Sequence, residues 1–190
     1  LKFSNTKFEE RTLLDWLKDI LARLSVCEKA LNTFMETKRV DFPRFYFMSS
    51  VDLLDVLSKG NNPFSINKHI SKIIIALDRL EMKGQEGGSE RPSAVGMHTR
   101  TGIEYIPFHS DCKLLGKVEN YLHTILQFMQ ESLKGIVKKS KAEIYQKSQL
   151  DWIGSTPSQV CLLTDLMKFV GNVEKGITSL ASNRNAMKSV

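Results

Sequence analysis

The sequence predicts a mainly α fold, in which elongated helical bundle segments are accompanied by one small β-hairpin. Apolar residues recur at helical spacing over long stretches toward both ends of the chain. Ser, Asn, Pro and Gly, which cap or interrupt helices, separate these stretches. One region, residues 94–108, instead has two β-prone runs around a Gly-containing turn, as in a hairpin.

The N-terminal part predicts a long helix over residues 13–39, preceded by a capping box of Thr6 and Glu9. Its apolar residues recur at alternating steps of four and three, which is typical of a narrow seam along another helix. Further apolar residues beside the seam, Leu14 and Leu21 among them, favour a helix within a bundle. At 1.5 Å per residue this helix would be about 40 Å long. The seam consists of Leu13, Leu17, Ile20, Leu24, Cys27, Leu31 and Phe34.

An aromatic run, residues 42–47, follows this helix. Pro43 blocks continuation of the helix, because its ring fixes φ and removes a backbone donor. The run predicts a short strand, in which alternation places Phe45 and Phe47 on one buried face. The two serines after it offer side-chain oxygens to free amides, so a short helix is expected over residues 51–59.

The turn that begins at Gly60 is expected to end the short helix and start a third one. Asn62 is the expected N-cap and Pro63 the expected first residue of this third helix. Apolar residues at helical spacing predict that it continues to about Glu81. Gly60 and Pro63 are candidate hinge residues, since hinge motion concentrates dihedral change in a few positions.

The predicted hairpin pairs residues 94–98 with residues 103–108, after a flexible loop over residues 83–92. Gly102 supplies the positive φ that a short bulged turn requires. Pro107 places the second strand at a sheet edge, because proline cannot donate to a ladder.

The hairpin tip is the best candidate for a partner contact. An edge hairpin that projects Arg100, Thr101 and Tyr105 presents backbone and side chains to a neighbour. The alternative is a hairpin that only covers the helices of its own fold.

The last third predicts two helices. The first begins at about residue 115 and extends as far as residue 148, with a kink or close helix contact at Gly135. The second begins near Pro157 and ends near Thr178. Gly154 and Pro157 break the chain between them and are candidate hinge residues.

We expect residues 1–182 to form one unit and residues 183–190 to be a disordered tail. The chain begins at Leu1, which indicates an excerpt from a longer polypeptide. Its longest apolar runs are far shorter than the roughly 20 residues that cross a bilayer, so we expect a soluble protein.

The cysteines and the charge point to no special chemistry. Cys27, Cys112 and Cys161 are scattered, which favours free thiols in a reducing compartment. Cys27 and Cys161 lie on apolar helix stripes, so both are expected to be buried. The net charge of +6 includes a lysine cluster over residues 134–141, interpreted as a solvated helix face.

No motif in the sequence indicates catalysis. Gly116 and Lys117 lack the remaining residues of a phosphate-binding loop. A metal site or Cys–His pair around His109 and Cys112, even with His98 across the hairpin, lacks further ligands or an orienting group. We therefore expect no catalytic residue, no bound metal and no cofactor.

Blocks of residues with one family's pattern occur in that family's order along most of the chain, from about residue 13 to about residue 177. They resemble the linker of dynein heavy chains, and resemble axonemal more than cytoplasmic dyneins. The blocks comprise Leu31, Asn32, Glu36, Lys38, Arg39, residues 42–47 (FPRFYF), residues 49–58, Gly96, Met97, Gly102, Glu104, residues 106–108, Trp152, residues 157–160, Val173 and Glu174.

The resemblance implies a helical lever that lies across a ring of AAA modules, and bends and straightens as ATP is turned over. The ATP sites would lie in those modules, so this chain by itself would be no enzyme. The implied partners are the AAA modules of the same heavy chain and, indirectly, microtubules and other dynein subunits, with no nucleic acid and no membrane. The implied location is the cytoplasmic cytoskeleton, in the axoneme of a cilium or flagellum.

Two alternatives belong to other classes. A stand-alone helical scaffold or adaptor would bind a partner helix through an exposed seam, independently of any ring. A basic nucleic-acid-binding module would stack bases on the aromatic run, and its affinity would fall steeply with salt.

Overall fold

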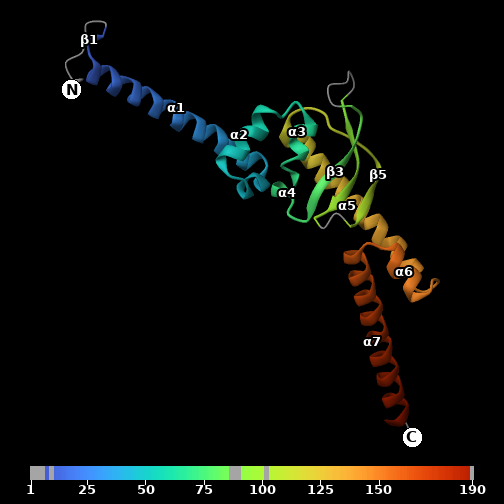
Figure 1. Ribbon diagram of the computed structural model, residues 1–190. Helices are drawn as coiled ribbons and strands as arrows, with labels where there is room; N and C mark the ends of the chain where they lie inside the picture. Colours follow the sequence, from blue (N-terminus) through green and yellow to red (C-terminus); the bar gives the residue numbers. More distant parts are fainter. Residues whose placement is uncertain (1–6, 9–10, 86–90, 101–102, 189–190) are drawn as a thin grey trace.

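The computed structural model describes residues 7–8, 11–85, 91–100 and 103–188. It confirms a mainly α fold with a small β element (Figure 1). The elements are β1 Lys7–Phe8, β2 Arg11–Thr12, α1 Leu13–Asp41, the 3₁₀ helix η2 Pro43–Phe47, α2 Ser50–Ser58, α3 Pro63–Asn67, α4 Ile70–Ile73, β3 Leu77–Lys83, β4 Ser93–Thr99, β5 Tyr105–Lys113, α5 Val118–Glu143, α6 Gln149–Ser155 and α7 Ser158–Lys188.

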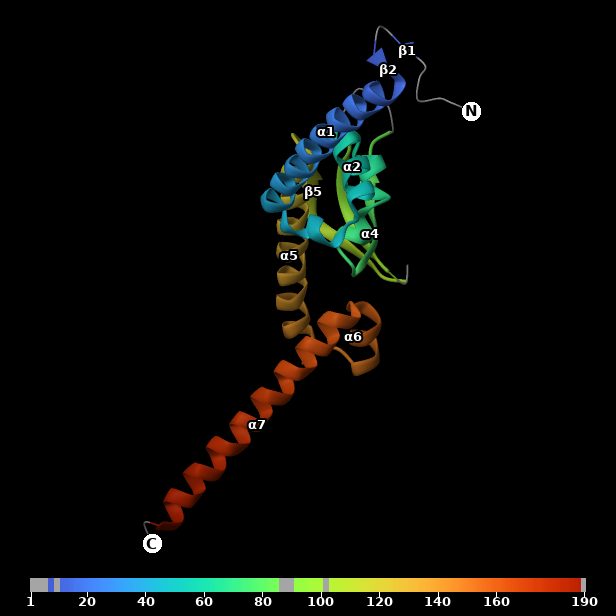
Figure 2. The same ribbon diagram turned by 90° about the vertical axis from the view of Figure 1, so that its left-hand side faces the viewer.

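Two long helices, α1 and α7, project from a central body on opposite sides, which gives the molecule an elongated shape (Figures 1 and 2). The body contains the short helices α2 to α4, the sheet and the first half of α5. One face of α5 packs against β5 and buries Tyr121, Leu122 and Ile125. The core is therefore central, and both ends of the chain lead away from it.

Helix α1 begins at Leu13, as predicted, but with a different cap. Thr12 is its N-cap, and the Thr12 side chain accepts a hydrogen bond from the backbone N–H of Asp15 at 3.3 Å. The predicted capping residues Thr6 and Glu9 lie outside the described residues. Most of the predicted seam is exposed, and Cys27, expected to be buried, is exposed as well. The reason is that α1 leaves the body, so no described element covers the middle of the helix (Figure 1).

The aromatic run is a 3₁₀ helix, so the predicted strand was wrong. Pro43 occupies its first position, where a fixed φ favours helix and the missing donor is not needed. The backbone N–H of Phe45 bonds the carbonyl of Phe42 at 3.0 Å, and that of Met48 bonds Phe45 at 3.1 Å. Helical turning separates the two phenylalanines that alternation would have paired. Phe45 is 0% exposed, whereas Phe47 is 63% exposed.

The predicted third helix is also wrong beyond its first turns. Asn62 caps α3 and Pro63 begins it, as predicted, but α3 ends at Asn67 and a strand occupies Leu77–Lys83. The amide of Asn67 donates to the carbonyl of Leu80 at 2.9 Å and accepts from the N–H of Leu80 at 2.8 Å. These two bonds hold the returning strand against α3. Between α3 and β3 the chain forms α4 up to Ile73, and Ile74 then takes an extended backbone, with φ −128° and ψ 94°.

The sheet has three antiparallel strands in the order β3-β4-β5 (Figure 1). The hairpin formed by β4 and β5 confirms the predicted one, and β3 is a further strand that the sequence analysis assigned to a helix. Strand β5 lies at an edge, as Pro107 predicted, and Pro107 pairs with Gly96 of β4.

The C-terminal third forms three helices, α5, α6 and α7, where two were predicted. One long helix was expected to extend as far as residue 148, but α5 ends at Glu143 and a separate α6 follows. Ser148 caps α6 by accepting from the N–H of Asp151 at 3.3 Å. Helix α7 continues to Lys188, beyond the predicted end near Thr178.

Gly135 makes no close helix contact, contrary to expectation. A methyl group built at this position meets no heavy atom within 4 Å outside its own helix backbone. We therefore expect Gly135→Ala to raise the free energy of unfolding by about 1 kcal/mol, because alanine loses less backbone entropy in a helix interior. Chemical denaturation of the purified chain measures this. A lower midpoint for the variant would show that Gly135 has a structural role in α5.

Candidate functional site: the junction groove

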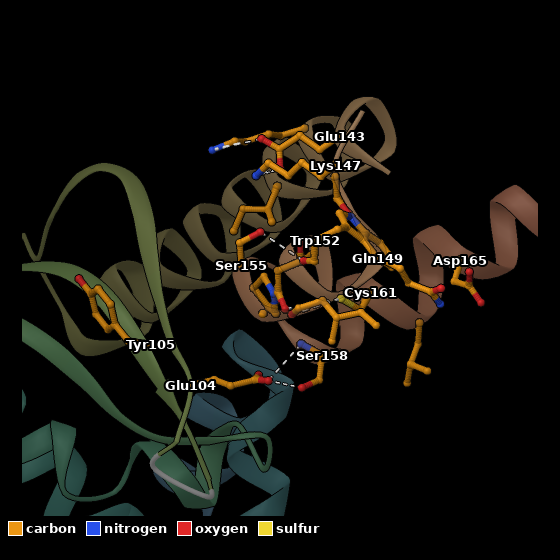
Figure 3. A pocket seen from close by; sticks show the side chains of 18 of the residues that line it. Glu104, Tyr105, Glu143, Lys147, Gln149, Trp152, Ser155, Ser158, Cys161 and Asp165 are labelled. Atoms are coloured by element: carbon orange, nitrogen blue, oxygen red, sulfur yellow. Dashed lines mark hydrogen bonds and ion pairs between the residues drawn. The ribbon is translucent and has the colours of Figure 1, made fainter. Parts of the chain in front are cut away.

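A groove of about 890 Å³ lies where the first residues of β5, the C-terminal half of α5, α6 and the start of α7 meet. We call it the junction groove. Figure 3 shows its side chains, with Glu104 pointing toward Ser158 and Tyr105 lying apart from the others. It contains both predicted hinge residues of this region, Gly154 and Pro157, and one predicted contact residue, Tyr105.

A buried hydrogen bond holds α6 against α5 within the groove (Figure 3). The indole N–H of Trp152 donates to the hydroxyl of Ser140 at 2.9 Å, and both residues are buried. Trp152 was expected to be a packing anchor, and its burial confirms this. Ser140 was missed, because a serine inside a helix carries no sequence signal for a partner twelve residues later.

Removing this acceptor should be costly. We expect Ser140→Ala to lower the free energy of unfolding by about 1–3 kcal/mol, because the indole N–H stays buried without a partner. Thermal denaturation measures the effect, with Ser155→Ala as the control, since Ser155 is an exposed serine of the same groove. Equal effects of the two substitutions would contradict a specific role for the buried bond.

A carboxylate from the hairpin contacts the first residue of α7. Glu104 accepts a hydrogen bond from the backbone N–H of Ser158 at 3.0 Å and another from the Ser158 hydroxyl (Figure 3). The N–H groups of a first helical turn have no partner within the helix, so a carboxylate there both satisfies a donor and complements the helix dipole. Glu104 belongs to one of the family-patterned blocks of the sequence, but no role was predicted for it.

Two ionisable side chains of the groove, Glu143 and Cys161, are held in ways that do not favour catalysis. Glu143 forms ion pairs with Lys147 at 3.0 Å and Lys139 at 3.8 Å. Burial raises the pKa of the Cys161 thiol, and its Sγ lies 3.6 Å from the carbonyl of Thr156. A protonated thiol is a poor nucleophile, so this cysteine does not indicate covalent catalysis.

The histidines considered as metal ligands have other partners. His98 lies 2.8 Å from a carboxylate oxygen of Glu81, and the His109 ring lies 3.3 Å from the Ser132 hydroxyl. Within the described part of the chain, no three His, Cys, Asp or Glu side chains are grouped so that they could hold a metal ion. Burial raises the pKa of Cys112 to about 11.

The structure describes two of the three predicted partner-contact residues. Arg100 is exposed, and its backbone N–H donates to the carbonyl of Ala76 at 3.1 Å. Thr101 lies outside the described residues. Tyr105 lies across Gly96 of the neighbouring strand, where a methyl group would come within 2.5 Å of its hydroxyl oxygen. Its contact with a partner stays a prediction.

In the first pair of predicted hinge residues, Gly60 lies against α5. The carbonyl of Gly60 accepts a hydrogen bond from the Tyr121 hydroxyl at 3.1 Å, and Pro63 is buried. The second pair is less enclosed. Gly154 lies within α6 with open space around it, and Pro157 lies between α6 and α7. Hinge motion at all four residues stays a prediction.

Comparison with known proteins gives a consistent result. The sequence profile of the family described as "Dynein heavy chain, N-terminal region 2" matches residues 3–140. The chain belongs to this dynein heavy chain family. Of the blocks on which the resemblance rested, the FPRFYF run and the hairpin lie within the matched residues, whereas those from Trp152 onward lie outside them.

Several relatives are dyneins of flagella and cilia by name. The chain is 40% identical over 159 residues to "Dynein alpha chain, flagellar outer arm" of Chlamydomonas reinhardtii, which covers 83% of this chain and 4% of that protein. It is 36% identical over 177 residues to "Dynein beta chain, ciliary" of Heliocidaris crassispina, which covers 93% and 4% respectively. Over 150 residues it is 42% identical to "Dynein axonemal heavy chain 11" of Sus scrofa, which covers 79% and 3%.

This dynein heavy-chain segment thus spans only 3–4% of the length of these relatives. In the described part of the segment, no helix combines the length and apolar character needed to cross a membrane. The groove and the projecting helices are therefore features of one small part of a much longer kind of protein.

Proposed function

We propose that this segment is a mechanical element of an axonemal dynein heavy chain, a part of the linker that transmits ATP-driven rearrangement of the AAA ring to the tail. The observation that carries the proposal is the family match over residues 3–140. In this proposal, the ATP sites lie in other modules of the heavy chain, and the partners of the segment are those modules and, indirectly, microtubules.

The shape of the segment supports a mechanical role. A lever needs a rigid body and stiff arms, and the segment has a packed centre with a long helix leading away on each side (Figures 1 and 2). Helix α1 would be about 44 Å long and α7 about 46 Å long, at 1.5 Å per residue. Arms of this length convert small rotations at the body into displacements of many ångströms.

The exposed faces of the two arms support a place within a larger assembly. Leu21 and Leu24 of α1 are 69% and 60% exposed, and Leu162 and Leu180 of α7 are 75% and 70% exposed. Apolar surface of this extent is usually covered by other protein. We infer that further parts of the heavy chain cover it. A stand-alone adaptor would instead leave these faces for a separate partner.

A motility assay tests the proposal. In the intact heavy chain, residues 1–190 are replaced by a flexible Gly/Ser chain, and ATP turnover and microtubule gliding are measured. We expect gliding velocity to fall by roughly tenfold or more while ATP turnover continues, because a flexible chain cannot transmit force. Unchanged gliding velocity would contradict the mechanical role.

A further inference from the structure

We propose that Glu104 is a positioning residue that sets the direction of α7, by binding the first residue of that helix from the neighbouring hairpin. The proposal concerns the geometry of the segment itself. It stands whether or not the segment acts as part of a lever, and it is tested without ATP or microtubules.

The backbone of Glu104 is fixed to the sheet. Its carbonyl accepts from the N–H of Thr99 at 3.0 Å, and its N–H donates to the Thr99 hydroxyl at 3.3 Å. Both bonds link the start of β5 to the end of β4, and β4 is the central strand of the sheet. The carboxylate of Glu104 therefore extends from a point that moves only with the body.

The carboxylate then binds α7 at two donors of a single residue. The N–H and the hydroxyl of Ser158 both donate to one oxygen of Glu104 (Figure 3). Hydrogen bonds to a charged acceptor are roughly twice as strong as those between neutral groups. Two donors on one acceptor also restrain the orientation of the helix end, and not only its distance from the hairpin.

The linker before α7 is short, and it contacts α7 through the N–H of Cys161, which donates to the carbonyl of Pro157 at 2.9 Å. Helix α6 ends at Ser155 and α7 begins at Ser158, so only Thr156 and Pro157 connect them. Pro157 has no N–H with which to bond its surroundings. The predicted hinge at Pro157 is therefore bridged by the contact between Glu104 and Ser158.

Beyond its first two turns, α7 has few contacts with the rest of the described chain, such as Lys168, whose ammonium lies 5.4 Å from the centroid of the Tyr145 ring. Val160 and Thr164 are buried, but none of the side chains that the structure describes in residues 165–181 is buried. The direction of the whole helix thus depends on contacts near its start. Lys175 lies about 25 Å from Ser158 at 1.5 Å per residue, so a pivot of about 20° at Ser158 would move it by roughly 9 Å.

Pulsed electron–electron double resonance tests the proposal in the 190-residue chain. Spin labels are attached at Lys134→Cys on α5 and Lys175→Cys on α7, both at exposed positions. Cys27→Ala and Cys161→Ala remove the two cysteines that are not buried. Circular dichroism of each variant checks that the helical content is retained.

We expect one narrow distance distribution in this reference chain. Glu104→Ala should widen the distribution roughly twofold, because the helix end can then pivot at the preceding linker. Glu104→Gln should restore much of the narrow distribution, since its amide oxygen still accepts from the N–H of Ser158. Asp165→Asn is the matched control, because it removes the same charge from the same groove at a position with no described partner. It should leave the distribution unchanged.

A second variant distinguishes loss of the contact between Glu104 and Ser158 from loss of helix stability. Ser158→Asp places a carboxylate in the first turn, which favours the helix, but it repels Glu104. We expect it to widen the distribution as Glu104→Ala does, and it decides the question if Glu104→Ala loses its helical content. An unchanged width in both variants, or equal widening by Asp165→Asn, would overturn the proposal.

Discussion

Phe45→Ala should lower the free energy of unfolding by about 3–5 kcal/mol, because it removes a fully buried aromatic side chain and leaves a cavity. The Phe45 ring is 0% exposed and meets the Phe42 ring edge-on, with 4.9 Å between the ring centroids. The cavity would lie where the end of α1 meets the short helices, so little can move to fill it. Urea denaturation of the purified chain measures the change.

Phe47→Ala is the matched control for this prediction. Phe47 is 63% exposed, so its truncation should change the free energy of unfolding by no more than about 0.5 kcal/mol. The two substitutions make the same chemical change two residues apart. Similar losses of stability would indicate that both rings are buried, as in the strand that the sequence predicted, and would contradict the 3₁₀ helix.

The second large effect is expected at a buried ion pair between α1 and α5. The ammonium of Lys38 lies 2.5 Å from the carboxylate of Glu119, and their side chains are 17% and 8% exposed. Lys38→Met keeps most of the side-chain volume but leaves the carboxylate unpaired, so we expect the free energy of unfolding to fall by about 3 kcal/mol.

Lys83→Met is the control. It breaks an exposed pair with Asp111 at 2.8 Å and should lower the free energy of unfolding by less than about 1 kcal/mol. Equal losses of stability in Lys38→Met and Lys83→Met would contradict the expectation that burial increases the cost of breaking an ion pair.

The same pair predicts how stability depends on pH. Burial, the largest single influence, would raise the pKa of Glu119, but the hydrogen bonds from Lys38 and from the backbone, together with the charges of Lys38 and Lys117, outweigh burial and hold this pKa below its ordinary value of 4.5. The hydrogen bond to Glu119 raises the pKa of Lys38 above 10.5, against the opposing effect of burial.

The signs of the two shifts give the pH window. The contribution of Glu119 is complete above pH 4.5 and is lost as the pH falls through its lowered pKa. The contribution of Lys38 is complete below pH 10.5 and is lost as the pH rises through its raised pKa. Without Lys38 the pKa of the buried Glu119 is higher than in the wild type, so the difference in stability between the wild type and Lys38→Met should shrink as the pH falls toward and below 4.5. A difference that stays the same at pH 3 would contradict this assignment.

Local signals predicted the elements whose ends are capped by their own residues. Ser49 accepts from the N–H of Asp52, and Asn62 from the N–H of Phe64, and both helices begin where these residues indicated. The edge strand followed from Pro107, because proline lacks a donor. In each case the decisive interaction spans only a few residues.

The errors arose where distant residues decide the conformation. The strand β3 depends on Asn67 binding the backbone of Leu80, thirteen positions later. The apolar pattern could not show that Phe45 is buried and Phe47 exposed. A run of five residues is too short for its period to distinguish a 3₁₀ helix from a strand. Likewise, the exposure of Cys27 follows from the projection of α1, which the apolar pattern of that helix does not reveal.

The candidate site was predicted only in outline. Gly154 and Pro157 indicated a break, and the structure places a groove there. Three side chains link the elements around the groove by hydrogen bonds, and no local pattern in the sequence predicted these bonds. They are Glu104, Ser140 and Ser158. Contacts between side chains on different elements can be predicted only when the fold is known as well as the sequence.

Fluorescence energy transfer in the intact heavy chain tests the mechanical role most directly. A donor is attached at Lys29→Cys, an exposed position of α1 on the side opposite the apolar seam, and an acceptor to the first ATP-binding module of the ring. If the segment is part of a lever, the distance between the two labels should change with each nucleotide state and return to its first value after a full cycle. The same transfer efficiency with ATP, with ADP and without nucleotide would contradict the proposed function.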